Sequence, residues 1–366
     1  MLTLKSLRHY AIARSLFAPT SLQGAIDRLG FVQADPIRAP ARAQDLILRQ
    51  RVRGYRAGDL EQHYPKLAVE EDYFVNYGFL APPHLELMHP RVPRRPTTAA
   101  TRRKMQALLL FAAERGEVHP RLANAHFQHG RVSNYWGGAS SATTLLLDRM
   151  HYQGLLRVAR REEGIRVYAP RPATAALAET PQRQAEALLR LAVRLYAPLP
   201  AASLGYLTGM LAHAAPQLYP HVRRVQRSAE QALAHTRVAG TTWYWPADEN
   251  PQEYPLQKRT RVRLLAPFDP VVWDRRRFEQ FWGWAYRFEA YTPKPKRKLG
   301  YYALPLLWQD QVIGWGNLSV TAKCLHAEIG YRKAHAPRSA LFRRELAAEL
   351  ARIAAFLGLE APVSGT

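Results

Sequence analysis

Apolar residues recur at the three-to-four-residue spacing of an α-helix in several separate segments of the chain. Helices are predicted over 4–17, 20–30, about 40–51 and 181–198, and in a closing segment that ends at Gly358. Thr20 or Ser21 is the predicted N-cap of the second helix. From about 258 to 333 the pattern changes to β-branched and aromatic runs broken by Gly, Pro and Asp, which predict five or six strands.

The clearest module lies at 117–170. A helical stretch near 119–128 is followed by a Gly/Ser-rich turn, a helix that Ser141 can cap and Gly154 can end, and two short β-type runs joined by "REEG". Helix, turn, helix and hairpin is the order of a winged helix. The hairpin carries the arginines placed to meet DNA phosphates, namely Arg157, Arg160, Arg161 and Arg166.

Two other segments follow a similar order, so the predicted fold is α+β, with tandem winged-helix modules before a β-rich domain and a closing helix. In the third segment a long helix is expected over "LYPHVRRVQRSAEQALAH". The predicted domains are 1–90, 91–175, 176–250 and 251–366.

Charge narrows the possible partners. The chain has 366 residues with 52 Lys+Arg against 29 Asp+Glu, a net charge of +23, which favours a polyanion and most often nucleic acid. An anionic membrane surface is the alternative partner. No uncharged apolar run approaches the ~18 residues that span a bilayer, so an integral membrane protein is not expected. The single cysteine, Cys324, indicates a cytoplasmic protein without a disulfide framework.

Several chemistries lack their motifs. There is no GxxxxGK[ST] phosphate loop and no GxGxxG after a strand, and "HFQH" at 126–129 has no second ligand pair for zinc. Neither a cofactor nor a metal is therefore expected, which leaves carboxylates, amides and water for any reaction.

The segment "FVQADPI" at 31–37 is predicted to be a short strand ended by proline, with Gln33 and Asp35 on one face. Basic residues follow it, and the candidate phosphate contacts here are Arg38, Arg42, Arg51 and Arg53. Basic clusters also occur at 91–104, 157–166, 258–263, 274–277 and 294–298, the last containing Lys296 and Arg297. A structural Asp in a turn before proline is the alternative interpretation of Asp35. Aromatic residues lie among the clusters and could stack on bases or fill the core: Trp136, Tyr168, Trp273, Trp282, Trp284 and Tyr286.

The segment "LLAPFDPVVWDRRRFEQFWGWAYRFEAYTPKPKRKLGYYALPLLWQDQVIG" resembles the β-domain signature of bacterial winged-helix DNA glycosylases of the YcaQ/AlkZ type. Members of that family remove alkylated purines and unhook interstrand DNA crosslinks, with a catalytic Gln-x-Gln or Gln-x-Asp motif. The resemblance implies that Gln33 and Asp35 of "QAD" are catalytic, in the form carried by the crosslink-unhooking branch. One departure is Asn76 in "YFVNYGF", where the family pattern has a histidine.

The resemblance implies a monofunctional DNA glycosylase that hydrolyses the N-glycosidic bond of N7-alkylated purines, including those in crosslinks. Its substrate would be double-stranded DNA, its state a monomer and its location the bacterial nucleoid. The carboxylate would stabilise positive charge on the sugar and accept a proton from water. The alternatives are a non-enzymatic winged-helix DNA-binding protein, such as a transcription regulator, and a homologue that only senses damage.

Overall fold

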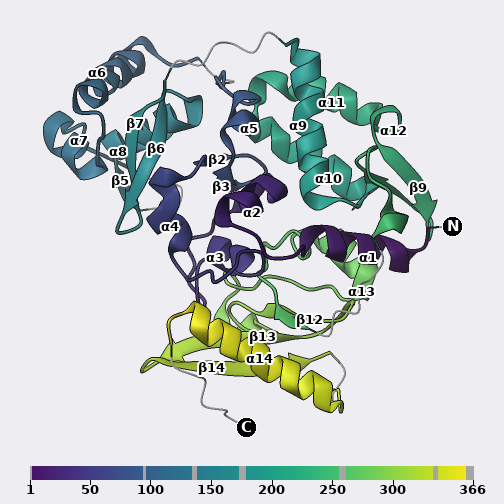
Figure 1. Ribbon diagram of the computed structural model, residues 1–366. Helices are drawn as coiled ribbons and strands as arrows, with labels where there is room; N and C mark the ends of the chain where they lie inside the picture. Colours follow the sequence, from purple (N-terminus) through teal and green to yellow (C-terminus); the bar gives the residue numbers. More distant parts are fainter. Residues whose placement is uncertain are drawn as a thin grey trace. The chain divides into compact units, whose positions relative to one another are not determined.

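The computed structural model describes residues 2–93, 96–133, 138–172, 179–254, 261–332 and 337–359. They mix helices and strands, as the α+β prediction requires, and form two compact units (Figure 1). Unit 1 comprises 1–60, 190–207 and 228–366, and unit 2 comprises 61–189 and 208–227. The chain passes between them within α4 (Asp59–His63), α9 (Pro181–Tyr196) and α10 (Ala201–Ala214). The division into four modules stays a prediction.

Unit 1 begins with α1 (Leu4–Ser15) and α2 (Leu22–Leu29). The Ser21 side chain caps α2 by accepting from the Gly24 amide, and Ser21 is one of the two residues predicted for that position. Next come β1 (Phe31–Gln33) and α3 (Ala43–Leu48). A second group, all from later in the chain, contains β8 (Leu199–Pro200), α12 (Ala229–Ala232), β9 (Ala234–Val238), β10 (Thr241–Trp245) and η3 (Pro251–Glu253). Its strands form an antiparallel sheet in the order β8-β10-β9.

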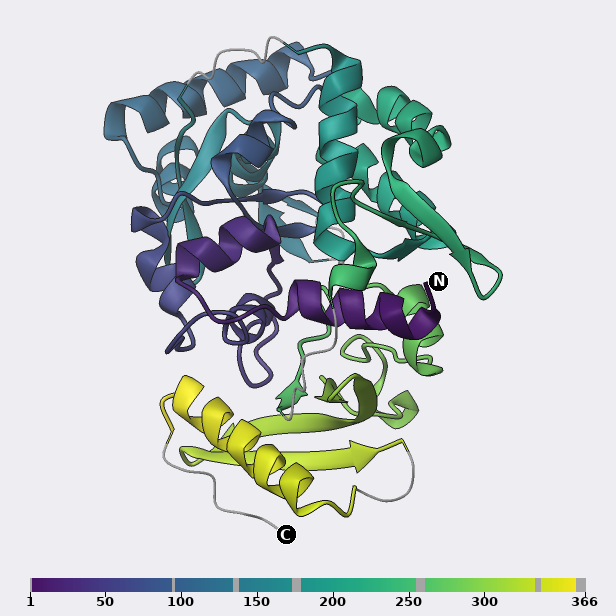
Figure 2. The same cartoon turned by 45° about the vertical axis from the view of Figure 1, so that its right-hand side comes forward.

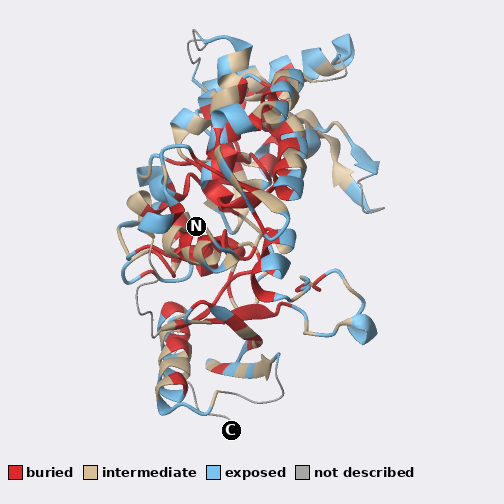
Figure 3. Cartoon of the chain, turned by 90° about the vertical axis from the view of Figure 1, so that its right-hand side faces the viewer, coloured by how far each residue is buried: buried red, intermediate tan, exposed pale blue. Residues whose placement is uncertain are grey.

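The β-rich part of unit 1 is a four-stranded antiparallel meander of β11 (Val262–Leu264), β12 (Leu304–Trp308), β13 (Gln311–Thr321) and β14 (Cys324–Tyr331). Strand β12 is buried over most of its length, whereas buried and more exposed residues alternate along β13 (Figure 3). Helix α14 (Ala340–Phe356) packs on this sheet (Figures 1 and 2). Its apolar residues Phe342, Ile353 and Phe356 are buried, so the closing helix is confirmed.

Five or six strands were expected in this region, and the structure replaces part of them with α13 (Arg275–Trp282) and the short η4 (Lys294–Lys296). The Asp274 side chain caps α13 by accepting from the amides of Arg276 and Arg277. Phe278, Phe281 and Trp282 then recur at helical spacing and are buried. The aromatic composition suggested strands, but the N-cap and the spacing decide for a helix.

Unit 2 contains η1 (Tyr64–Lys66), the hairpin of β2 (Glu70–Tyr73) and β3 (Tyr77–Leu80), α5 (Pro82–Glu86) and α6 (Ala99–Arg115), followed by α7 (Pro120–Phe127), β4 (Arg131–Ser133), β5 (Ala139–Ser141), α8 (Ala142–Gln153), β6 (Leu156–Glu162) and β7 (Ile165–Pro170). It ends with η2 (Pro216–Leu218) and α11 (Tyr219–Arg227). The expected long third helix of the third segment is wrong, because α11 stops at Arg227 and β9 begins at Ala234.

The helix and hairpin expected at 117–170 are present. Ser141 caps α8 through the amide of Thr144, and Gly154 ends it with φ 83°. A Cβ at Gly154 would lie 2.4 Å from the His89 ring, so both backbone and space require glycine there. Strands β6 and β7 pair antiparallel. Residues 134–137 of the predicted turn, including Trp136, lie outside the described residues, and the winged-helix interpretation stays a prediction.

Candidate active site

Asp35 lies in a turn directly after β1. The strand was expected to continue to Pro36, but it ends at Gln33, and the Asp35 Oδ1 atom accepts a hydrogen bond of 2.9 Å from the Ile37 amide. This side-chain turn caps the chain around Pro36 in place of strand pairing. The turn geometry that the alternative interpretation expected is therefore present, but it occupies only one carboxylate oxygen. Within the part of the chain that the structure describes, Oδ2 accepts no hydrogen bond from the protein.

Partial burial determines the electrostatics of Asp35. Desolvation raises the pKa of its carboxyl above the ordinary value, and the Ile37 amide opposes this only in part. No arginine, lysine or histidine forms a salt bridge with Asp35 among the described residues. A half-buried carboxylate without a cationic partner is a poorly solvated negative charge, which suits a site where positive charge must be stabilised.

Two amides accompany the carboxylate. Gln33, the last residue of β1, is buried at 6% exposure. Gln44 in α3, at 7% exposure, was not singled out in the sequence, and its Oε1 accepts a 3.4 Å contact from the Asp35 amide. Its only sequence signal is its place beside Asp45 as one of two polar residues in the helical run "AQDLIL".

Aromatic residues from the β-rich part also lie at this site. We name Phe268, Phe288, Tyr291 and Tyr302 the aromatic wall. The Phe288 ring stands edge-on to Tyr302 at 5.2 Å, to Tyr291 at 5.9 Å and to Phe268 at 5.2 Å between ring centroids. Burial raises the pKa of both tyrosines, and the negative charge of Asp35 raises each further, so both hydroxyls are close enough to sense the carboxylate.

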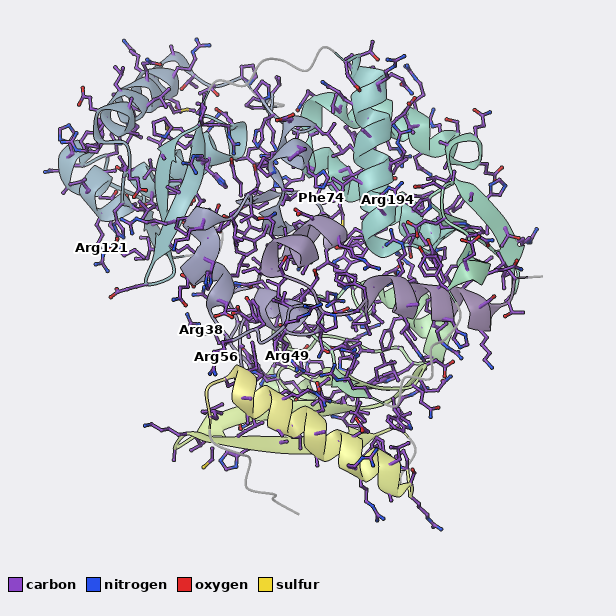
Figure 4. All side chains as sticks on the ribbon, viewed as in Figure 1. Arg38, Arg49, Arg56, Phe74, Arg121 and Arg194 are labelled. Atoms are coloured by element: carbon purple, nitrogen blue, oxygen red, sulfur yellow. The ribbon has the colours of Figure 1, made fainter. Side chains whose placement is uncertain are left out.

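A cavity of about 1130 Å³ begins three residues beyond Asp35. It lies between the Arg38–Pro40 segment, the Gly300–Tyr302 segment, strands β13 and β14, and helix α14. Arg38 is exposed and lines it, and Figure 4 labels Arg38 beside α14. The cavity brings the segment after the candidate catalytic residues together with Tyr302 of the aromatic wall, which no spacing in the sequence predicted.

Buried ion pairs hold this segment in place. Arg51, expected to contact DNA, has no exposed side-chain surface, and its guanidinium donates to both Asp269 oxygens at 2.8 and 2.9 Å and to the carbonyl of Ser15. Asp269 belongs to the "FDP" stretch of the β-domain signature. The Arg51 prediction is therefore corrected: its charge is used to attach the segment after the candidate catalytic residues to the β-rich part.

A second network of ion pairs and hydrogen bonds, around Glu349, also attaches this segment to the β-rich part. Glu349 of α14 is buried, and its carboxylate pairs with Arg49 and Arg352 and accepts from the Leu264 amide at 3.1 Å. Burial alone would raise the pKa of Glu349, but the two arginines outweigh it, so the pKa lies below its usual range. The Gln50 side chain joins the network through the carbonyl of Leu264 at 3.2 Å (Figure 4 labels Arg49).

The other predicted DNA contacts of unit 1 differ in exposure. Arg53 is exposed, and Arg42 is half-buried and forms the N-cap position of α3. Lys296 is exposed in η4. Arg297 is half-buried, donates to the carbonyl of Thr292 at 2.7 Å and lies over the Tyr301 ring at 5.0 Å. All four keep at least part of their surface open to a phosphate.

In unit 2 the arginines of the β6–β7 hairpin also differ in exposure. Arg160 has a 42% exposed side chain that pairs with Glu117 and Glu162, and Arg157 is half-buried. Arg166 pairs with Asp148 at 3.0 Å and lies over the Tyr77 ring. Arg161 is corrected: its side chain is 17% exposed and forms a double hydrogen bond to buried Glu71, so it serves the fold.

Aromatic residues expected either to stack on bases or to fill the core mostly fill the core. Tyr168, Trp282 and Tyr286 are at most 5% exposed. Asn76, which stands where a histidine was expected, is exposed in the turn between β2 and β3, and its carbonyl accepts from the Phe74 amide at 2.8 Å (Figure 4 labels Phe74). The structure thus places this departure in a hairpin turn of unit 2.

No group of three or more His, Cys, Asp and Glu side chains among the described residues could hold a metal ion. In the same residues, no helix is long and apolar enough to cross a membrane.

A family model described as "DNA glycosylase AlkZ-like" matches residues 26–356. Because that span is most of the chain, the protein belongs to the AlkZ-like DNA glycosylase family, and it is an enzyme that acts on DNA. Among solved structures, Streptomyces sahachiroi DNA glycosylase AlkZ is similar, with a TM-score of 0.62 and 15% identity over 99% of each chain. At that identity the likeness shows a shared fold. The resemblance found in the sequence is confirmed.

Proposed function

We propose that this glycosylase hydrolyses the N-glycosidic bond of N7-alkylated purines in duplex DNA, including purines joined in interstrand crosslinks. The observation that supports this most is Asp35, a half-buried carboxylate without a cationic partner that lies beside an aromatic wall. An N7-alkylated purine carries a ring positive charge, and positive charge develops on the sugar as the bond breaks. A poorly solvated carboxylate stabilises both.

The reaction needs water and no cofactor. The bond between C1′ and the purine N9 breaks, and its electron pair moves to N9, which neutralises the cationic base. Water oxygen forms the new bond to C1′, and Asp35 accepts the water proton through its second oxygen. The products are an abasic site and a neutral alkylated base. Because the raised pKa of Asp35 makes it a better base than a free aspartate, burial serves the proton transfer as well.

Gln33 orients the water in this proposal. An amide can hold a water molecule but cannot take its proton, so Gln33 supports Asp35 without replacing it. Gln44, which contacts the Asp35 backbone amide, keeps the turn in place.

DNA is held by the arginines and lysine that keep exposed surface. These are Arg38, Arg42, Arg53, Arg157, Arg160, Arg166, Lys296 and Arg297. Arg51 and Arg161 are left out because their guanidinium groups are committed to Asp269 and Glu71. Contacts to phosphates carry no sequence information, so binding to undamaged duplex should be salt-dependent and largely independent of sequence.

An open site is compatible with a crosslinked base. Asp35 is half-buried and Tyr291 of the aromatic wall is 72% exposed, so the carboxylate does not sit at the end of a deep pocket. A purine tied to the opposite strand cannot be rotated fully into such a pocket. We infer that the enzyme acts as a monomer on chromosomal DNA in the cytoplasm and needs only a limited extrusion of the base.

The test is incubation of the purified protein with duplexes containing one 7-methylguanine or one nitrogen-mustard crosslink. Abasic sites and unhooked strands are scored in single turnover. We expect excision from both duplexes and none from undamaged DNA. Asp27→Asn is the matched control for Asp35→Asn, since Asp27 is an exposed aspartate of α2 whose side chain, among the described residues, is hydrogen-bonded only to Gln23.

A protein that binds both duplexes without releasing a base would refute the proposed substrate and favour a damage sensor. A footprint confined to one sequence and insensitive to salt would instead favour the transcription regulator.

A further inference from the structure

The surroundings of Asp35 are unusual for a chain of net charge +23. Two buried carboxylates elsewhere in unit 1, Asp269 and Glu349, are paired with the arginines Arg51 and Arg49. Near Asp35 lie instead two tyrosines that sense its charge and Phe288, whose ring contacts both of them. A carboxylate beside electron-rich ring faces attracts a cation, and the fold brings no cation of its own into ion-pair contact there.

Tyr291 has the exposure of a binding residue. Its side chain is 72% exposed, the largest exposure among the large hydrophobic and aromatic residues on the described surface. One ring edge is in contact range of Phe288, at 5.9 Å and 75° between rings, so the ring is supported while much of it stays open. A supported ring with this much open surface offers a face on which a planar ligand can stack.

Tyr302, in contrast to Tyr291, is buried. The residue is 3% exposed, its ring meets Phe288 edge-on at 89°, and it lines the cavity with Arg38. Its hydroxyl is buried and has no hydrogen-bond partner among the described residues. Buried hydroxyls normally have a partner, and leaving one without a partner is destabilising. An unpartnered hydroxyl at the wall of a candidate site points to a ligand that supplies the partner.

We propose that Tyr291 and Tyr302 form the subsite that recognises the cationic base, with Tyr291 stacking on the alkylated purine and the Tyr302 hydroxyl donating to the polar edge of that base. This inference rests on the proposed function and adds to it the residues that distinguish an alkylated purine from a normal one. A purine of either kind stacks on a ring. Only the charged one gains the additional cation–π attraction and the field of Asp35.

The experiment measures discrimination in binding, so it does not depend on turnover. Two duplexes carry 2′-fluoro nucleotides, which slow glycosidic cleavage, one with 7-methylguanine and one with guanine. The ratio of their dissociation constants is measured for the wild-type enzyme and for Tyr291→Leu. We expect a wild-type preference for the charged base, and a ratio reduced about 3- to 30-fold in the leucine variant.

Three variants separate stacking from simple bulk. Tyr291→Phe and Tyr291→Trp keep an aromatic face and should keep the preference, with Trp equal to or above Tyr. Leucine preserves hydrophobic volume but has no π-face. Tyr206→Leu is the matched control, because Tyr206 is another tyrosine of unit 1 with 53% exposure, in contact with Arg276 and Trp273. Its discrimination should equal that of the wild type.

Tyr302→Phe removes only the hydroxyl and keeps the ring against Phe288. We expect affinity for the 7-methylguanine duplex to fall about 3- to 10-fold, the effect of one hydrogen bond to a polar group, while the melting temperature stays level or rises. A lower melting temperature with unchanged affinity would show that the hydroxyl serves the fold and would remove Tyr302 from the subsite.

Failure of this subsite can be told apart from failure of the proposed function. If the wild-type enzyme excises 7-methylguanine and Tyr291→Leu discriminates as well as the wild type does, the subsite is refuted and the function stands. If leucine abolishes the preference while the wild-type enzyme releases no base, the subsite stands and the enzyme acts on another cationic lesion.

Discussion

Asp35 of unit 1 and Asp72 of unit 2 are two aspartates with opposite environments. Asp72 is fully buried, accepts from Arg91 at 2.9 Å and pairs with His89. Burial alone would raise its pKa, but Arg91 and His89 outweigh this and hold the pKa well below the usual range. Asp35 is less buried, yet its pKa is raised, because only the Ile37 amide opposes desolvation. Partners, and not depth, decide the charge state.

The difference indicates what each residue is for. A carboxylate whose charge is matched by an arginine and a histidine attracts a cationic substrate only weakly, and its removal leaves a buried cation uncompensated. A carboxylate whose negative charge is not neutralised by a cationic side chain can stabilise a developing cation. Asp72 is therefore expected to matter for stability and Asp35 for chemistry.

The largest expected effect is the loss of excision rate in Asp35→Asn. Asparagine keeps the acceptor for the Ile37 amide and removes the charge, so the turn survives and the base is lost. The single-turnover rate of 7-methylguanine excision should fall about 10²- to 10⁴-fold. DNA binding should persist, because a repulsive charge is gone. Wild-type excision by a folded Asp35→Asn protein would reduce Asp35 to a turn residue.

Asp72→Ala should act on stability instead. It leaves the Arg91 guanidinium buried without its anion, although the carbonyls of Tyr73, Tyr152 and Ala214 still accept from it. We expect the free energy of unfolding to fall by about 3–5 kcal/mol in urea titrations. Below the unfolding transition, the excision rate per folded molecule should change little. A selective loss of rate without loss of stability would contradict the comparison.

The amide residues should have intermediate effects. Gln33→Ala should lower the excision rate by about tenfold, less than Asp35→Asn, because an amide orients water but cannot accept its proton. Gln33→Glu is the informative companion, since it adds a second carboxylate and should raise the pH at which activity appears. A larger loss in Gln33→Ala than in Asp35→Asn would exchange their proposed roles.

Asp35 and Asp72 should make opposite contributions to stability as the pH falls. The raised pKa of Asp35 means that excision should be lost, as pH falls, at a higher pH than for an unperturbed aspartate. The same shift means that ionised Asp35 destabilises the fold, so Asp35→Asn should melt higher than the wild type near neutral pH, with the difference vanishing in acid. The lowered pKa of Asp72 contributes stability that is lost as pH falls. Melting temperatures across a pH series measure both.

The smallest expected effect separates two neighbouring arginines of the hairpin. Arg160→Gln should weaken binding to undamaged duplex and reduce the salt slope by about one, because its half-exposed side chain can reach a phosphate. Arg161→Gln should leave the slope unchanged and lower stability, because Glu71 loses its partner. If the salt slope of Arg160→Gln were as steep as that of Arg161→Gln and of the wild type, this hairpin would not contact DNA.

The sequence predicted the features that depend on local order. The N-cap at Ser21, the N-cap at Ser141 and the end of α8 at Gly154 follow from side chains that satisfy helix ends or permit positive φ. The polyanion partner follows from net charge, and the family from the β-domain signature. Local pattern did not predict α13 correctly, because its aromatic composition suggested strands whereas the spacing of its apolar residues is helical.

Tertiary structure alone decided which charges are available. Arg51 and Arg53 are two positions apart, yet one is buried against Asp269 and the other is exposed, because the partner of Arg51 lies 218 residues away. The aromatic wall likewise reaches Asp35 from residues 268–302. The sequence by itself determined that the chain binds DNA and carries a Gln-x-Asp motif. Which basic side chains stay exposed, and what surrounds Asp35, depend on long-range packing, which local spacing does not encode.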